Sequence, residues 1–357
     1  MSEDERATLL SSALFATVAE RRADAFVTGA EALFPRPAGE GHRAEIRMQR
    51  ANPMGVLEAL ALIGLHLRSA DDFTISMTPG DLKECRRWAF YWLLARELLP
   101  SWGPSWRSLV PEKPDSGGFL NGLAHALIVR VGHVVRARDR VHLELKLPPD
   151  IESADEALFA LDGLFVSLDA CFDVIARVLN RYHNLGGDSG ARWRNDGWVK
   201  DLTKKDSSLT EVLATGGPFA DVVVLIGRFR RSLHGVPSQT IACSEGFRND
   251  VENLLVVPPE EQETILNVIG RRGGDACWGV RPGIDELAFV DLRVFVEALT
   301  RSALEAIETA VAAVVGPDAD FDRRGDWSDT PQVRHQLRAL SGTVGWNERQ
   351  GAHPTAH

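Results

Sequence analysis

The sequence has few cysteines and no long hydrophobic run. Its four cysteines are spread over 357 residues without a CxxC pair, which excludes a disulfide scaffold, and we expect them to be small buried side chains in a reducing compartment. The densest apolar stretch, 56–67, is interrupted by Glu58 and His66 and is too short to cross a bilayer. The first six residues, Met-Ser-Glu-Asp-Glu-Arg, lack the basic-then-apolar order of a secretory signal. We therefore predict a cytoplasmic protein without a membrane span.

Several motifs of catalytic sites are also missing. The sequence has no P-loop, no GxGxxG after a strand, no HExxH, no GxSxG and no zinc-finger spacing. These absences argue against nucleotide-dependent enzymes, metallohydrolases and α/β-hydrolases. His125, His133 and His142 have no carboxylate at convincing ligand spacing. We therefore predict no metal and no cofactor.

Positive charge is outnumbered by negative charge and is carried mostly by arginine. The formal net charge is −10, which argues against sequence-independent binding of a polyanion over the whole surface. Lys and Arg together number 40, and because six of these are Lys, 34 are Arg. A single arginine is therefore no sign of function in this chain, and only clusters of charge are informative.

The N-terminal region, 1–148, is predicted to be helical and its role is unknown. Helices are expected over 1–34, over Met54–Leu67, and over Leu82–Leu99 after a start at Thr78-Pro79-Gly80-Asp81. Apolar residues then alternate with polar ones over Val141–Leu147, which predicts a strand paired with Val131–Ala137. The expected fold class is thus mainly α, with a minor β element near 131–147.

A helical bundle is predicted over 149–316, followed by a polar tail over 317–357. Ser153 and Glu156 form a capping box for a long helix. Its apolar residues recur at alternating steps of three and four, which is typical of a packed helix: Leu158, Leu161, Phe165, Leu168, Phe172, Ile175, Leu179 and Tyr182. Further helices are expected from Pro218 to about 234 and over 285–315.

One cluster of residues could carry chemistry, at the end of the helix that begins at Pro218. The run Arg228-Phe-Arg-Arg-Ser-Leu-His234 places Arg230 and Arg231 on the same side of a helix as His234. Guanidinium groups can hold a phosphoryl group in a bidentate manner, and an imidazole can move a proton near neutral pH. The cluster therefore predicts a phosphate site, although the histidine could instead simply complement a helix C-terminus.

This region resembles the HEPN superfamily, whose ribonuclease members carry an Arg followed by a His after four to six residues. Arg228 and His234 are separated by five residues, and the preceding helix carries acidic residues such as Asp173, as in several HEPN families. Arg230 to His234 is also similar to the Arg-Asn-x-Ile-His-His run of some members. The chain departs from the pattern because Phe229 or Arg231 replaces the usual polar residue and Gly235 replaces the second His.

The resemblance implies a four-helix bundle and metal-independent RNA cleavage, in a defence or toxin role. His234 would assist attack by the ribose 2′-hydroxyl or protonate the leaving oxygen, and Arg228 or Arg230 would stabilise the transition state. Asp173 would orient the Arg or the His. Family members commonly build the site across a dimer, so the resemblance also implies a homodimer. The identity of a partner protein is unknown from the sequence.

Basic residues near the motif are the expected contacts to RNA, and they are Arg231, Arg192, Arg194, Lys204 and Lys205. Trp193 and Trp198 lie among them, where they could either stack on unpaired bases or dock on the core. The alternative function is a non-catalytic interaction or small-ligand-binding protein with a degenerate HEPN-like bundle. The positions of Arg228, Arg230 and His234 discriminate, because a shared cleft favours the nuclease and ion-paired burial favours the alternative.

Overall fold

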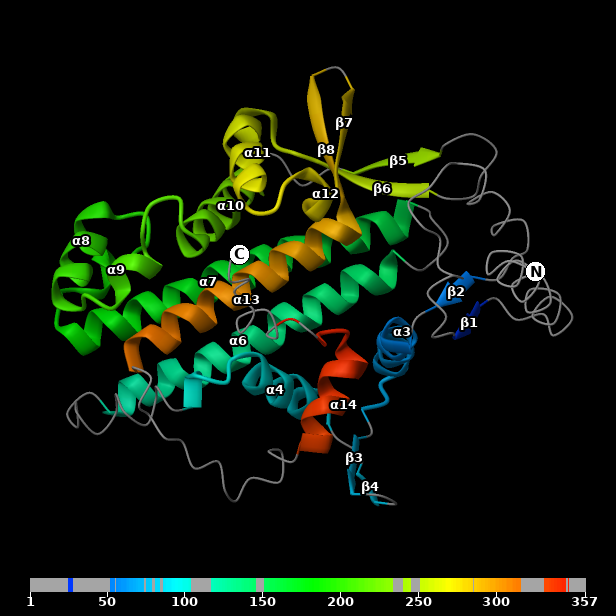
Figure 1. Ribbon diagram of the computed structural model, residues 1–357, viewed down its shortest axis with the longest axis horizontal. Helices are drawn as coiled ribbons and strands as arrows, with labels where there is room; N and C mark the ends of the chain where they lie inside the picture. The colour runs from blue at the N-terminus through cyan, green and yellow to red at the C-terminus, as the bar shows by residue number, and fades with distance from the viewer. Residues whose placement is uncertain are drawn as a thin grey trace, which may run out of the picture. The chain divides into compact units, whose positions relative to one another are not determined.

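The computed structural model describes residues 25–27, 52–54, 56–73, 75–78, 81–83, 86–103, 117–145, 151–233, 240–244, 251–284, 286–315, 331–344 and 346. The chain forms two compact units, the smaller from residues 1–72 with 335–344 and the larger from 73–334 with 345–357. Most described residues are helical, which confirms the mainly α class (Figure 1). The predicted boundary near residue 148 falls inside the larger unit.

The smaller unit contains a helix and two short strands. β1 (Ala25–Val27) pairs in parallel with β2 (Asn52–Met54), so the prediction of a helix over 1–34 is wrong at these three residues, and its remainder lies outside the described residues. α3 (Val56–Ser69) confirms the next predicted helix. Gly64 lies so close to Leu340 that a Cβ would overlap its carbonyl oxygen, to which Arg68 Nη1 donates at 2.6 Å. Glycine is therefore required there for close packing.

In the larger unit a hairpin stands where a helix start was predicted. β3 (Ile75–Thr78) pairs antiparallel with β4 (Asp81–Lys83), and α4 (Arg87–Leu98) begins nine residues after Thr78. The prediction was wrong because a Pro-Gly dipeptide favours a chain reversal over helix initiation. On α4, Phe90 and Tyr91 are buried, whereas Trp88 is 67% exposed.

The predicted β element near 131–147 is helical over 131–144, where it forms the end of α6 (Gly117–Glu144), and residues 146 and 147 lie outside the described residues. Val134 and Val135 follow Val131 at steps of three and four, Val141 follows Val134 at a step of seven, and all four are fully buried, which fits a helix and not a two-residue alternation. β-branched residues and a short apolar alternation suggested a strand, but packing against α4 and against α7 (Ile151–His183) overrides this local preference.

α6 is also the one described helix that is long and apolar enough to span a membrane, over Gly118–Glu144, although no span was predicted. Length and composition are weak evidence, because core helices meet the same criteria. α6 packs against α4, α7 and α13 (Leu292–Val315) within the larger unit, and it carries the buried Arg138 and Asp139. We therefore interpret it as a core helix of the bundle.

α7 confirms the long predicted helix, and six of its eight predicted apolar positions, all except Leu158 and Tyr182, are buried. It begins at Ile151, so Ser153 lies within the first turn and is not the N-cap, which makes the capping-box prediction wrong. The helix ends at His183, where Asn184 adopts a φ of 53° before Gly186 with a φ of 117°. The predicted stop at Gly186 is therefore correct to within three residues.

The core of the bundle is an aromatic cluster that joins α7, α10 (Pro218–Leu233), α12 (Asp275–Trp278) and α13. The Phe165 and Phe229 rings stack at 5.1 Å between centroids. Phe295 lies 4.9 Å from Phe229 and 6.0 Å from Trp278. Figure 1 shows α6 and α7 running side by side for most of their lengths, and α13 also packs against both.

A four-stranded antiparallel sheet interrupts the predicted bundle and was missed in the sequence. Its order is β5 (Thr240–Ser244), β6 (Val251–Val256), β8 (Leu287–Asp291), β7 (Val280–Ile284). Between β6 and β7 lie η4 (Pro259–Glu261), α11 (Gln262–Arg271) and α12. The predicted helix over 285–315 is wrong over Leu287–Asp291, because these residues pair with both neighbouring strands.

Two further predictions need correction. The tail over 317–357 contains a helix, α14 (Pro331–Ser341), whose Val333 and Leu337 are buried. Cys171 is buried as expected, but Cys277 is exposed. Cys85 and Cys243 have side chains outside the described set.

Candidate functional site

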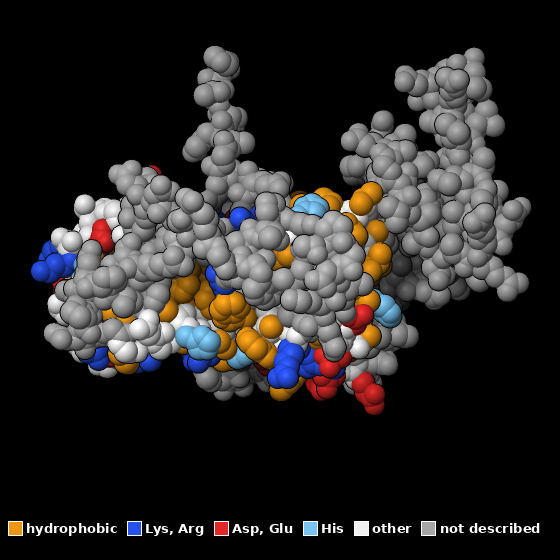
Figure 2. Space-filling view, turned by 90° about the horizontal axis from the view of Figure 1, so that it is seen from below, with side chains coloured by type: hydrophobic (Ala, Val, Ile, Leu, Met, Phe, Trp, Pro, Cys, Tyr) orange, Lys and Arg blue, Asp and Glu red, His pale blue; other side chains and the backbone are white. Residues whose placement is uncertain are grey.

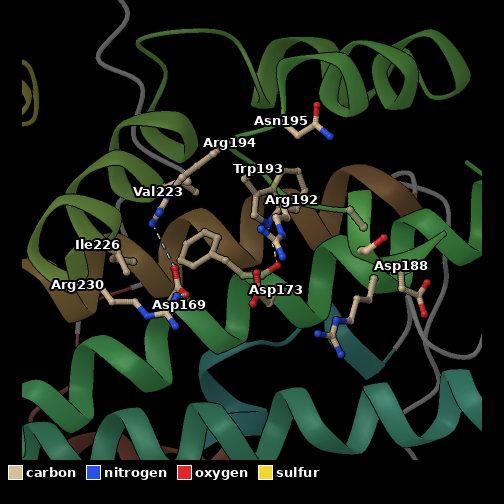
Figure 3. Close-up of a pocket in the computed structure, with 14 residues that line it drawn as sticks. Asp169, Asp173, Asp188, Arg192, Trp193, Arg194, Asn195, Val223, Ile226 and Arg230 are labelled. Atoms are coloured by element: carbon tan, nitrogen blue, oxygen red, sulfur yellow. Dashed lines mark hydrogen bonds and ion pairs between the residues drawn. The ribbon is translucent and has the colours of Figure 1, made fainter. Parts of the chain in front are cut away.

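A polar pocket of about 910 Å³ lies in the larger unit between α7, α10 and the segment 188–195 (Figure 3). Its charged lining residues are Arg177, Arg192, Arg194, Arg230, Asp169, Asp173 and Asp188. Four guanidinium groups and three carboxylates give this lining a formal charge of +1. We call it the arginine pocket.

Two helices present their pocket residues at helical spacing. Asp169, Asp173 and Arg177 follow one another at steps of four on α7, so they share one face of that helix. Val223, Ile226 and Arg230 lie at steps of three and four on α10. The facing stripes of two packed helices therefore form the floor and one wall.

Segment 188–195 is held in place by two tryptophans and one buried asparagine. Trp193 Nε1 donates to the carbonyl of Phe172 at 2.7 Å, and Trp198 Nε1 donates to Asn180 Oδ1 at 2.9 Å. Asn180 Nδ2 in turn donates to the carbonyl of Gly186 at 3.0 Å. These bonds fix the loop that carries Arg192 and Arg194. Both tryptophans thus dock on the core, which is the structural alternative considered above.

The segment continues into α8 (Asp196–Lys205), and Asn195 caps this helix. Its Oδ1 accepts a hydrogen bond from the Trp198 amide at 3.3 Å. α9 (Leu209–Val212) follows before α10. The cap and the two tryptophans together give the pocket loop a defined course although it has little regular structure.

Asp169 is the centre of the ion pairs in the pocket. Its carboxylate pairs with Arg230 through Oδ2 and with Arg194 through Oδ1, the latter at 3.6 Å (Figure 3). Arg230 and Arg194 remain 40% and 49% exposed, so both can also contact a ligand.

The position of Arg194 depends on Gly227 of α10. A Cβ at residue 227 would overlap the Arg194 guanidinium, which lies directly over the helix backbone at that point. Glycine in the interior of a helix lowers stability by about 0.5–1 kcal/mol relative to alanine. At residue 227 it allows the Arg194 guanidinium to lie directly against the α10 backbone. Alanine at residue 227 would therefore displace the end of the Arg194 side chain, although Gly227 is not one of the residues that line the pocket.

Asp173 is the one pocket carboxyl with a raised pKa. Burial raises the pKa most, the neighbouring Asp169 raises it further, and the charges of Arg177, Arg230 and Arg192 oppose both effects. A carboxyl group with a raised pKa in a pocket is a candidate for proton transfer. Its ionised form lowers the stability of the fold at neutral pH.

Replacing Asp173 with asparagine should therefore stabilise the protein at neutral pH. Because the folded-state pKa lies above the unfolded one, the folded state holds this proton more tightly, and stability is lost as pH rises through that window. We expect a gain at the lower end of the ~0.5–2 kcal/mol typical of single stabilising substitutions at pH 7, and no gain near pH 3. Denaturant unfolding at both pH values measures it.

Asp155→Asn, on an exposed residue of the same helix, is the control and should give no gain at either pH. A destabilised Asp173→Asn variant at pH 7 would show that the ionised carboxylate supports the fold.

The pocket brings together four of the predicted site residues, namely Asp173, Arg192, Arg194 and Arg230. Arg228 points elsewhere. Its Nη1 contacts both carboxylate oxygens of Glu261 at 2.8 and 3.1 Å, and Arg231 Nη1 contacts the same carboxylate at 2.9 Å. Glu261 is buried, so these pairs bind α10 to η4.

Those of the other predicted residues that the structure describes do not line the pocket. His234 lies outside the described residues. Lys204 and Lys205 are exposed on the last turn of α8 and do not line the pocket. The RNA contacts expected at Lys204, Lys205 and Arg231 thus belong to other surfaces than the one shared by Arg192 and Arg194.

Sequence reasoning did not assign Asp169, Arg177 or Asp188 to a site. Asp169 and Arg177 stand four residues before and after Asp173, so the helical repeat alone could have identified them. Asp188 had no such signal. It joins the pocket because Asn180 Nδ2 contacts it at 3.4 Å and Arg181 pairs with it at 2.7 Å.

No family model, no curated protein and no solved structure matches this chain. Within the described ranges, no group of three or more His, Cys, Asp or Glu side chains is placed to hold a metal ion. The chemistry of the pocket must therefore be argued from its own side chains.

Proposed function

We propose that this protein binds RNA through the arginine pocket and that it is a HEPN-like, metal-independent ribonuclease. The observation that supports this most is the meeting of Arg230, Arg192 and Arg194 with Asp173 in one pocket. Partly exposed guanidinium groups grip a phosphodiester, and a carboxyl group with a raised pKa can exchange a proton with it. A defence or toxin role and a homodimer rest on the family resemblance alone.

The proposed chemistry uses Arg230 as the motif arginine in place of Arg228. Arg230 would neutralise charge that develops on the phosphate oxygens as the ribose 2′-hydroxyl attacks the adjacent phosphorus. His234, which follows the last residue of α10 in the sequence, or Asp173 would accept the hydroxyl proton. A proton would then pass to the 5′ oxygen that leaves, so the products are a 2′,3′-cyclic phosphate and a free 5′-hydroxyl.

One observation favours the alternative of non-catalytic binding. Arg228, the arginine of the Arg-x5-His pattern, is engaged by the buried Glu261 and does not line the pocket. Arg230 is likewise paired with Asp169. A pocket of this kind can hold a phosphate-bearing ligand without cleaving it, as a small-ligand or interaction module would.

Binding and cleavage of labelled single-stranded RNA by the full chain, in the presence of a metal chelator, distinguish these functions. We expect Arg230→Gln to weaken binding by roughly 10-fold or more, because a charge-assisted hydrogen bond contributes about 1.5–3 kcal/mol. We expect His234→Ala to keep binding and to slow cleavage by roughly 10²–10⁴-fold, as loss of a proton-transfer group does.

Arg228→Gln is the matched control and should leave RNA affinity unchanged, since its guanidinium is held by Glu261. Binding that depends on Arg230 without any cleavage would support the non-catalytic alternative. Absence of RNA binding by the wild type, or equal binding by all variants, would contradict the proposal.

A further inference from the structure

A strip of positive charge runs along α6, outside the arginine pocket. Arg130, His133 and Arg136 are exposed and follow one another at steps of three, so they form one ridge of the helix. No Asp or Glu occurs from Gly117 to Ala137. A helix face with three basic side chains and no acid is unusual in a chain whose net charge is −10.

The charge of this strip is not neutralised within the part of the chain that the structure describes. Neither Arg130 nor Arg136 forms an ion pair with a described residue, whereas the next exposed arginine, Arg140, pairs with Glu144 at 2.8 Å and with Glu156 at 3.2 Å. The pKa of His133 is lowered, first by partial burial and then by the charges of Arg130 and Arg136. The positive charge of Arg130 and Arg136 therefore has no ion-pair partner among the described residues.

Apolar side chains flank the strip on α7. Phe159 is 77% exposed and Val166 is 50% exposed. α6 and α7 run antiparallel, because Arg140 pairs with Glu156 near one end and the Arg181 guanidinium lies 5.1 Å from the centroid of the Phe119 ring near the other. Phe159 lies one turn from Glu156, which places it beside the Arg136 end of the strip. Figure 2 shows a face of the molecule on which hydrophobic, histidine, basic and acidic side chains lie near one another.

The other end of the strip leads toward the arginine pocket. Phe159, Val166 and Asp173 follow one another at steps of seven on α7, so they lie on one face of that helix. Asp173 lines the pocket, as does Asp169, three residues after Val166. The exposed apolar side chains beside the strip therefore lead along α7 to the pocket.

We propose that Arg130, His133 and Arg136, with the exposed Phe159 and Val166 beside them, form a track for the backbone and bases of single-stranded RNA that leads into the arginine pocket. This inference rests on the proposed function and extends it from one phosphodiester to a strand of several nucleotides. Cations that follow the backbone, interleaved with an exposed aromatic ring on which a base can stack, are the means by which single strands are held without sequence preference. Net negative charge elsewhere confines the strand to this path.

The test compares two labelled RNAs by fluorescence anisotropy, a trinucleotide and an oligonucleotide of about 12 residues, a length within the ~4–16 nucleotides that such grooves cover. We expect the wild type to bind the longer RNA at least ~10-fold more tightly than the trinucleotide, since two further phosphate contacts contribute more than about 1.4 kcal/mol. The variant Arg130→Gln/Arg136→Gln should lose this advantage. Its slope of log K against log[salt] should fall by about 1.4, which is ~0.7 for each of two contacts.

A matched control removes two cations from α13, with Arg293→Gln and Arg301→Gln, and should retain the wild-type preference for the longer RNA. Arg230→Gln should weaken binding of both RNAs, whereas the strip variant should leave the trinucleotide affinity unchanged. These patterns separate the two proposals. The wild type could bind the two RNAs with equal affinity while Arg230→Gln still weakens binding of the trinucleotide. In that case the track is wrong and the pocket proposal stands.

The strip could also contact another copy of the chain, and light scattering decides this. A loss of oligomer mass in the Arg130→Gln/Arg136→Gln variant, with RNA affinity unchanged, would overturn the track and identify a self-association surface. Unchanged mass together with a loss of affinity for the longer RNA alone supports it.

Discussion

Phe295→Ala should lower the free energy of unfolding by about 3–5 kcal/mol, the largest effect that we expect of any single core substitution in this chain. Phe295 is fully buried, and its ring lies within 6.4 Å of Phe165, 4.9 Å of Phe229 and 6.0 Å of Trp278, measured between centroids. The ring therefore joins three helices of the bundle to the short helix before β7. Its removal leaves a cavity that these rigid elements can fill only in part.

The same substitution at Phe159 is the control, because that side chain is 77% exposed and packs against little. Phe159→Ala should change the free energy of unfolding by no more than about 0.5 kcal/mol. Urea denaturation followed by tryptophan fluorescence measures both. Similar values for the two variants would show that the aromatic cluster does not hold the larger unit together. If Phe295→Ala does not fold, Phe295→Leu should give a smaller but measurable loss.

Arg138→Met should cost about 3 kcal/mol at neutral pH, near the lower end of the range for breaking a buried ion pair. Arg138 is buried on α6, and its guanidinium contacts both carboxylate oxygens of Glu297 on α13, at 2.7 and 3.0 Å. It also lies 5.0 Å from the centroid of the Trp346 ring. The lower end applies because Glu297 is 35% exposed and can turn toward water once its partner is lost.

This loss should depend on pH in a defined direction. Burial alone would raise the pKa of Glu297, but the charge and hydrogen bonds of Arg138 and His142 outweigh it and lower the pKa to about 2. A carboxyl whose folded-state pKa is depressed contributes stability above its unfolded pKa of 4.5 and loses it as pH falls toward about 2. The wild type and Arg138→Met should therefore differ most at pH 5–7 and converge toward pH 2.

Arg136→Met, two residues away, is the matched control. Arg136 is exposed and forms no ion pair with a described residue, so the cost should be below ~0.5 kcal/mol. Arg138→Lys keeps the charge but not the bidentate geometry, and should be intermediate. A pH-independent difference between wild type and Arg138→Met would show that side-chain packing, and not the ion pair, is what the substitution removes.

The long helices could be predicted where burial repeats at helical spacing over many turns. α7 and α10 were located within a few residues, because steps of three and four in the apolar positions leave few alternatives. Over 141–147 the same reasoning failed, since seven residues fit a strand as well as the end of a helix. The alternation there is not matched by burial, because Glu144 is buried and Leu143 is only half-buried.

The sheet β5-β6-β8-β7 was missed in the sequence for a different reason, because its strands pair with segments that are distant in the chain. β6 and β8 are far apart in the sequence, and their pairing of Leu255 with Val290 depends on contacts that no local pattern records. Leu287–Asp291 continues directly into α13, so its apolar residues extend the helical pattern without a break. Only pairing with strands on both sides makes this segment β.

The candidate site was predicted only in part. Spacing in the sequence determines which residues share a face of a helix, but it does not determine which distant residues they contact. Arg228 and Arg230 are two residues apart, so rotation of ~100° per residue sends them to opposite sides of α10, as the sequence alone already required. The sequence by itself thus determined the class of fold, the long helices and a set of charges on their faces. Which carboxylate each charge meets was decided only by the tertiary structure, because Glu261, Asp169 and segment 188–195 reach α10 from distant parts of the chain.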